Sequence, residues 1–143
     1  LVIDPELTTA LILGAKSGVD VRIITPYKYD KWYVHIVTQA YYPELIRAGV
    51  RIYEYTPGFI HSKTFISDDD TATIGTINLD YRSLYLHFEC GVFLYKSRAV
   101  TQLKDDFLTM LTYCKEITIR DCNNTGIFKR LLQSILKVFA PLL

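Results

Sequence analysis

The chain has 143 residues, of which 50% are hydrophobic, 22% charged and 13% aromatic. This composition excludes a disordered or low-complexity protein, and the length suits about one domain with its own core. Sixteen basic and fifteen acidic residues leave a net charge of +1, which argues against a dedicated nucleic-acid binder. The three cysteines, Cys90, Cys114 and Cys122, are too scattered for a disulfide framework or a zinc site, which favours a reducing compartment.

The predicted elements of the first half alternate between helix and strand. Asp4-Pro5-Glu6 combines an N-cap, a proline at the first helical position and an acid in the first turn, so a helix begins there and stops near Gly18. A strand is predicted over 19–24, ending before Pro26. A helix over 30–48 follows, with an interruption at Pro43 left open and Gly49 closing it, and then a strand over 50–55.

In the second half, strands cluster before the last helices. Three β-rich runs cover 59–67, 71–75 and 86–95, and the acidic turn 68–70 joins the first two as a hairpin. A helix is predicted over 97–114. We therefore expect an α/β domain over residues 1–116, followed by a tail over 117–143. No run of about 18 uncharged apolar residues occurs.

The most informative pattern begins at His61-Ser62-Lys63. On the predicted strand, residues two apart point to the same face, so an imidazole and an ammonium would lie side by side. Asp68, Gly75 and Asn78 follow and complete the pattern H-x-K-x4-D-x6-G-[ST]-x-N.

This pattern resembles the HKD signature of the phospholipase D superfamily. Its continuation, 78–83 (NLDYRS) and 87–89 (HFE), resembles the second catalytic half of bacterial cardiolipin synthases, as does the segment 53–59 (YEYTPGF). The resemblance covers essentially the whole chain. It implies a phospholipase D-like sandwich, with a mixed central β-sheet flanked by helices, as the N-terminally truncated half of a pseudo-two-fold pair.

The residue types suit attack on a phosphodiester. Imidazole is a nucleophile that is neutral at pH 7, and an ammonium and an amide can bind the non-bridging oxygens as charge builds. The resemblance implies that His61 is the nucleophile or its acid/base counterpart and that Lys63 and Asn78 bind phosphate. Neither a cofactor nor a metal is expected.

Three further residues have two interpretations each. The resemblance implies that Glu89 accepts a hydrogen bond from the imidazole, and the alternative is an exposed strand glutamate. Ser83 corresponds to a hydroxyl near the phosphate, or it simply caps a loop. Asp68 is expected to be structural, because aspartate is favoured at a turn, and the run 68–70 does not require a metal. His35 is expected to be structural, while His87 stands where related synthases usually carry asparagine.

The tail carries four basic residues against one acidic residue, whereas residues 1–116 have a net charge of −2. From Gly126 onwards, apolar residues recur at helical spacing with Lys129, Arg130 and Lys137 among them. Such a helix suits an anionic membrane surface, and it could equally dock on the domain with its basic side in water.

The chain contains one HKD motif, because neither His35 nor His87 begins a second H-x-K. The family builds its site from two such motifs, so the other half is expected upstream in a longer, membrane-bound enzyme, as the start at Leu1-Val2-Ile3 without an initiator methionine suggests, or in a second copy. The resemblance implies transfer between two phosphatidylglycerol molecules, giving cardiolipin and glycerol, at the cytoplasmic side of a bacterial cell membrane. The alternatives are an inactive fragment that only binds lipid, and a homodimeric phosphodiesterase or nuclease.

Overall fold

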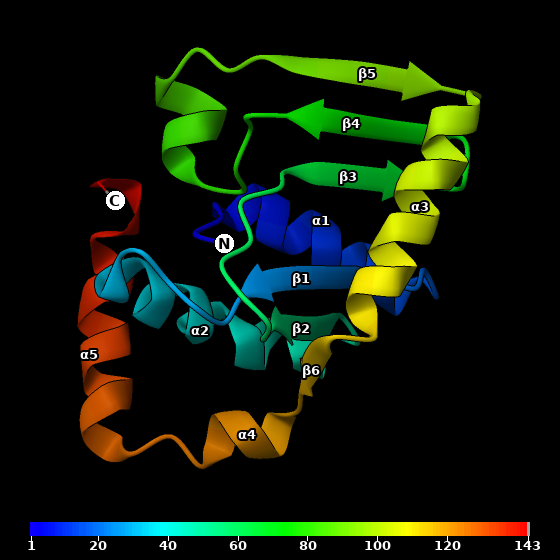
Figure 1. Ribbon diagram of the computed structural model, residues 1–143. Helices are drawn as coiled ribbons and strands as arrows, with labels where there is room; N and C mark the ends of the chain where they lie inside the picture. The colour runs from blue at the N-terminus through cyan, green and yellow to red at the C-terminus, as the bar shows by residue number, and fades with distance from the viewer. Residues whose placement is uncertain (143) are drawn as a thin grey trace.

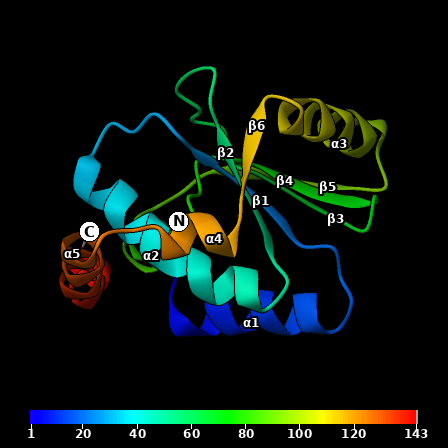
Figure 2. The same cartoon turned by 90° about the horizontal axis from the view of Figure 1, so that it is seen from below.

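The computed structural model describes residues 1–142, so Leu143, the last residue of the predicted tail, lies outside the described residues. The α/β class is confirmed: α3 covers one side of the strands, and α1 and α2 cover the other (Figures 1 and 2). In chain order the elements are α1 (Pro5–Lys16), β1 (Arg22–Pro26), α2 (Trp32–Arg47), β2 (Arg51–Tyr55), β3 (Thr64–Ser67), β4 (Thr71–Gly75), a π-helical turn η1 (Arg82–Leu86), β5 (Gly91–Tyr95), α3 (Arg98–Leu111), β6 (Cys114–Ile117), α4 (Ile119–Asn123), α5 (Ile127–Val138) and a 3-10 turn η2 (Ala140–Leu142).

The strands form two three-stranded sheets, and the mixed sheet of the predicted sandwich is one of them. One sheet, in the order β1-β2-β6, is mixed, because β1 and β2 are parallel while β2 and β6 are antiparallel. The other, in the order β3-β4-β5, is antiparallel throughout. The N-terminus lies near the centre of the view in Figure 1, between the two sheets, and Val2 makes a parallel bridge with Asp80.

The core lies between the mixed sheet and the helices α1 and α2. Its buried side chains come from the first residues of the chain, α2, the strands β2 and β6, and the C-terminal turn: Val2, Ile3, Val37, Tyr41, Tyr42, Leu45, Val50, Ile52, Ile117 and Ala140. Pro43 does not interrupt α2. The neighbouring Tyr42 and Leu45 are buried, so packing of this face outweighs the backbone hydrogen bond that proline cannot donate.

The start of α1 is confirmed, since the Asp4 side chain accepts a hydrogen bond from the Leu7 amide at 2.6 Å. The predicted position of the next strand is wrong by about three residues. β1 pairs in register with β2 from Arg22 to Pro26, so the ladder includes the proline. Pro26 is tolerated because it is the last residue of the strand.

Two of the predicted strands are too long. β3 begins at Thr64 rather than 59, so His61 and Ser62 precede the strand, and β5 begins at Gly91 rather than 86. Both strands pair with β4, which ends at Gly75, and Lys63 O accepts the last bond, from Gly75 N at 3.2 Å. Beyond that point neither segment has a partner strand among residues 1–142.

The tail begins inside the sheet. The predicted boundary after residue 116 falls within β6, an element that the sequence analysis missed by extending the preceding helix to 114. Thr118 and Asp121 then form a capping box that starts α4. The predicted amphipathic helix is confirmed as α5, which packs against α2.

A buried carboxylate in the core gives a first prediction. Glu54 is 4% exposed and accepts hydrogen bonds from Tyr42 Oη at 3.2 Å and Gln39 Nε2 at 3.3 Å. Tyr42→Phe leaves this charge with one donor fewer, so we expect a loss of about 1–3 kcal/mol in the free energy of unfolding, measured by urea denaturation.

The matched control is Tyr41→Phe. Tyr41 is also buried, but its hydroxyl makes no hydrogen bond within residues 1–142. We expect this change to stay within about 0.5 kcal/mol. Equal losses in the two variants would contradict the role given to the Tyr42 hydroxyl.

Candidate active site

The motif residues gather at one end of the β3-β4-β5 sheet. Lys63 directly precedes β3, residues 76–78 directly follow β4, and Glu89 lies two residues before β5. Because neighbouring strands are antiparallel, the start of β3, the end of β4 and the start of β5 lie side by side at this end of the sheet. We call this margin across the strand ends the edge. This edge lies at the left of the upper sheet in Figure 1, next to η1.

His61 and Lys63 come from an irregular segment rather than from alternate positions of a strand. The His61 side chain is exposed, and its ring stacks on Phe59 with centroids 5.7 Å apart. Lys63 Nζ donates to the His61 carbonyl oxygen at 2.7 Å, which ties the ammonium to the backbone of the histidine. Partial burial lowers the pKa of Lys63, while the carboxylates of Glu89 and Asp80 oppose this effect.

Gly75 and Asn78 are at the end of β4. A Cβ at Gly75 would lie 2.3 Å from the Cys90 carbonyl oxygen and 2.6 Å from Gly91 Cα, so the position requires glycine for close approach rather than for a special turn. Asn78 follows in the loop and is exposed. Its amide is therefore accessible at the same edge as Lys63.

Glu89 is held by Thr76. The Thr76 hydroxyl donates to the Glu89 carboxylate, and the Thr76 amide donates to the Cys90 carbonyl oxygen at 2.9 Å. The hydroxyls of Thr76 and Ser83 hold the pKa of Glu89 below its ordinary value. Among the described residues the carboxylate makes no hydrogen bond to His61, so that contact stays a prediction.

η1 and its C-cap residue, His87, place three polar side chains beside this edge. Ser83 is buried, and its amide donates to Asp80 Oδ1 at 2.8 Å. The guanidinium of Arg82 lies 3.2 Å from His87 Nε2, and His87 N donates to Arg82 O at 2.8 Å. His87 is therefore tied to the turn that precedes it.

Asp68 lies at the far end of β3 from Lys63. It has a φ of 51° in the turn that joins β3 to β4, and it accepts from Ser67 Oγ at 2.9 Å. This position fits the structural role expected for it. Within residues 1–142, no group of three or more histidine, cysteine or acidic side chains could hold a metal ion.

Two residues at this edge, Thr76 and Arg82, were not predicted from the sequence as site residues. Thr76 occupies the [ST] position of the motif, so the pattern itself marked it, but its contact with Glu89 joins residues thirteen positions apart. Arg82 stands within 78–83 (NLDYRS), and its pairing with His87 depends on the π-helical turn. A propensity-based interpretation does not predict such a turn.

Solved structures with this fold identify its class. Nuc of Salmonella typhimurium, described as a phospholipase D family member, superposes with a TM-score of 0.69 at 18% identity, covering 81% of this chain and 76% of Nuc. A phosphatidylserine synthase of Haemophilus influenzae superposes with a TM-score of 0.69 at 16% identity, covering 98% of this chain and 37% of that protein. The chain therefore has a phospholipase D-type fold.

Sequence comparison defines the family within that class. The family described as "Cardiolipin synthase, PLD-like domain" matches residues 1–111, and the chain belongs to it. An uncharacterised protein of Streptococcus mutans is 44% identical over 143 residues, covering all of this chain and 31% of that protein. Cardiolipin synthases of Halalkalibacterium halodurans and Alkalihalophilus pseudofirmus are 43% and 41% identical over 140 residues, covering 98% of this chain and 28% of each enzyme. The chain thus spans about three tenths of these relatives.

Gly75 gives a prediction that can be tested without an activity assay. Gly75→Ala forces the β4 and β5 backbones apart, so we expect a loss of about 2–4 kcal/mol in the free energy of unfolding. Gly58→Ala is the control, because a Cβ there meets nothing within 4 Å. It should be neutral or stabilise by about 0.5 kcal/mol. Equal stability of the two variants in urea denaturation would contradict the close approach at Gly75.

Proposed function

We propose that the chain supplies one catalytic half of a phosphatidyl transferase, which converts two phosphatidylglycerol molecules into cardiolipin and glycerol. The observation that supports this most is a complete HKD pattern, with His61 and Asn78 accessible at one sheet edge, in a chain of the cardiolipin synthase family. The phospholipid class of the substrate follows from that family, and the reaction through phosphohistidine is our proposal.

In the first step the imidazole of His61 attacks the phosphorus of one phosphatidylglycerol. A P–N bond forms, the bond between phosphorus and the headgroup glycerol oxygen breaks, and a general acid gives that oxygen a proton. Lys63 and Asn78 bind the non-bridging oxygens as negative charge develops. Partial burial and the hydrogen bond to the His61 carbonyl oxygen hold the Lys63 ammonium in place.

In the second step a glycerol hydroxyl of another phosphatidylglycerol attacks the phosphohistidine. Its proton passes to the group that served as acid, a P–O bond forms, and the P–N bond to His61 breaks. Cardiolipin leaves and the imidazole is regenerated. The carboxylate of Glu89, held by Thr76, stabilises positive charge on the imidazole of His61. Ser83 lies beside this carboxylate.

The acid that protonates the leaving glycerol comes from a second motif. This chain supplies one HKD motif, so the second motif comes from another segment of a longer polypeptide or from a second copy of the chain. Phosphatidylglycerol and cardiolipin reside in bilayers, so the site works at a membrane surface, which we place on the cytoplasmic side of a bacterial cell membrane. No helix in the described part of the chain is long and apolar enough to cross a membrane.

Trapping the intermediate tests the nucleophile. The chain, joined to a second HKD half so that the general acid is present, is incubated with phosphatidylglycerol labelled in its phosphate and quenched in alkali, which preserves phosphohistidine. Mass spectrometry then locates an adduct within residues 1–143. His61→Ala should abolish the adduct, whereas His35→Gln and His87→Asn should retain it, because these are the other two of the three histidines. An adduct that persists in His61→Ala would overturn the mechanism.

Lys63 gives a kinetic test. Lys63→Ala removes a phosphate ligand, so turnover should fall by about 100-fold or more while the thermal midpoint changes by under about 2 °C. Lys28→Ala is the control, because Lys28 Nζ also donates to a backbone carbonyl, that of Pro57 at 3.4 Å, but lies outside the motif. A large loss of stability with unchanged turnover would contradict the phosphate role.

The source of the second half is tested by adding it. The chain is assayed on phosphatidylglycerol vesicles alone and fused behind the preceding part of the Halalkalibacterium halodurans synthase. Our proposal expects cardiolipin only from the fusion, or from the chain alone if it dimerises. Hydrolysis of nucleic acid by a dimer would instead favour the nuclease, and an inactive fusion that still binds lipid would favour the lipid-binding fragment.

A further inference from the structure

α5 contacts the rest of the molecule along one side. Leu136 packs against the core, and Lys137 Nζ lies 3.6 Å from Glu44 and 4.3 Å from the Tyr41 ring centroid. Figures 1 and 2 both show α5 at the periphery. The other side, with the C-cap residue, carries six exposed large side chains, which we call the apolar face of α5: Ile127, Phe128, Leu131, Ile135, Val138 and Phe139.

The apolar face of α5 is continuous. Ile127, Leu131 and Ile135 recur every four residues, which places them on one stripe of a helix. The exposed fraction is 83% at Ile127, 90% at Phe128 and 76% at Val138. The helix therefore docks on the domain with its apolar face exposed, whereas the docked alternative considered from the sequence placed its basic side in water. A contiguous exposed apolar patch of this kind marks a surface that binds a partner or a membrane.

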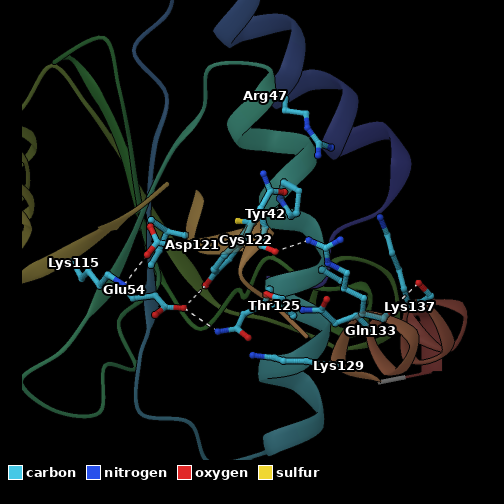
Figure 3. Close-up of a pocket in the computed structure, with 17 residues that line it drawn as sticks. Tyr42, Arg47, Glu54, Lys115, Asp121, Cys122, Thr125, Lys129, Gln133 and Lys137 are labelled. Carbon is cyan, nitrogen blue, oxygen red and sulfur yellow. Dashed lines mark hydrogen bonds and ion pairs between the residues drawn. The ribbon is translucent and has the colours of Figure 1, made fainter. Parts of the chain in front are cut away.

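A basic cavity lies on the flank of the same helix. It has a volume of about 510 Å³ and lies between α2, α4 and α5 (Figure 3). Its five cationic side chains are Arg47, Lys115, Lys129, Arg130 and Lys137. Its two carboxylates already have partners. Glu54 accepts from Tyr42, and Asp121 pairs with Lys115 at 3.1 Å.

Three of these cations remain available for an anion. Within residues 1–142, Arg47, Lys129 and Arg130 form no ion pair with a carboxylate, and Arg130 donates instead to the Asn123 carbonyl oxygen at 2.7 Å. The cavity therefore keeps a positive charge next to the apolar face. Phosphate oxygens are the acceptors that such a group of lysine and arginine donors suits.

We propose that α5 lies in the interface of an anionic phospholipid membrane. The apolar face of α5 enters the boundary between headgroups and acyl chains, while the cations of the cavity flank lie at the level of the lipid phosphates. Apolar and basic residues on adjoining sides of one helix are the pattern of an interfacial helix. At 12 residues, α5 is too short to span a bilayer.

Charge also favours lipid over a second copy of the chain. Two α5 helices that met face to face would bring their cationic flanks together, and like charges across an interface oppose association. The proposal depends on the proposed function only for its probe lipid, phosphatidylglycerol. Its readout is binding, so either idea can fail without the other: vesicle binding without phosphohistidine would refute only the function, and phosphohistidine without vesicle binding only the docking.

The apolar face is tested by vesicle flotation. The chain is mixed with vesicles of phosphatidylglycerol and phosphatidylcholine in equal parts, or of phosphatidylcholine alone. We expect at least about tenfold stronger partition into the anionic vesicles, weakened by salt. Leu131→Ser should lower partition by about threefold or more. Leu13→Ser in α1 is the matched control, because both leucines are 59% exposed on helices.

The cationic flank is tested by a matched pair of lysine substitutions. Lys129→Gln should weaken partition into anionic vesicles by about fivefold and leave binding to phosphatidylcholine unchanged. Lys96→Gln, just after β5 and away from α5, should change neither. Both sites are exposed, so each variant is expected to fold, and a thermal midpoint within about 2 °C of the parent checks this.

Two results would overturn the proposal. One is partition that does not depend on phosphatidylglycerol or on the α5 substitutions. The other is a dimer, seen by sedimentation without lipid, that Leu131→Ser converts to a monomer while vesicles fail to bind the parent chain. In that case a second copy, rather than a membrane, covers the apolar face.

Discussion

At Gly75 the strands β4 and β5 come so close that any side chain would meet the Cys90 carbonyl oxygen at 2.3 Å. This contact sets the register in which Gly75 faces Gly91, and the loops on either side inherit their positions from it. Thr76, one residue on, bonds to both Cys90 and Glu89. The lysine before β3 joins the same edge because its carbonyl oxygen accepts the Gly75 amide. The site therefore lies where the strand pairing of an antiparallel sheet ends, and the close approach at Gly75 fixes the position of that end.

The charges at this edge are arranged so that a cation stays available. Lys63 is partly buried, which lowers its pKa, and the one hydrogen bond of its ammonium within the described residues goes to the uncharged carbonyl oxygen of His61. Glu89 and Asp80 act on it at a distance, while each is satisfied by a hydroxyl or an amide nearby. A partly desolvated ammonium without an ion pair gains most from an incoming anion, in agreement with the proposed phosphate substrate.

The motif could be predicted from the sequence because its spacing is local, and so could the α/β class, since most helices and the turn at Asp68 follow capping and turn rules. The extent of the strands could not. Whether the chain is strand at His61 or Glu89 depends on where β4 ends, which is a property of a different segment. The same holds for β6, whose four residues pair with β2 across more than fifty positions. Periodicity showed that α5 is amphipathic, but which side faces the protein depends on tertiary packing.

The two surfaces discussed above are compatible with one orientation at a membrane. η1, beside the candidate active site, and α5 both lie at the left of Figure 1, so a plane on that side can touch both. Leu86 and Phe88, next to the site, are also largely exposed. A membrane on that side would thus contact η1 as well as α5, in agreement with the proposed docking. The near-zero net charge of the chain conceals the basic surplus of the tail, because all but one of the acidic residues lie in residues 1–116.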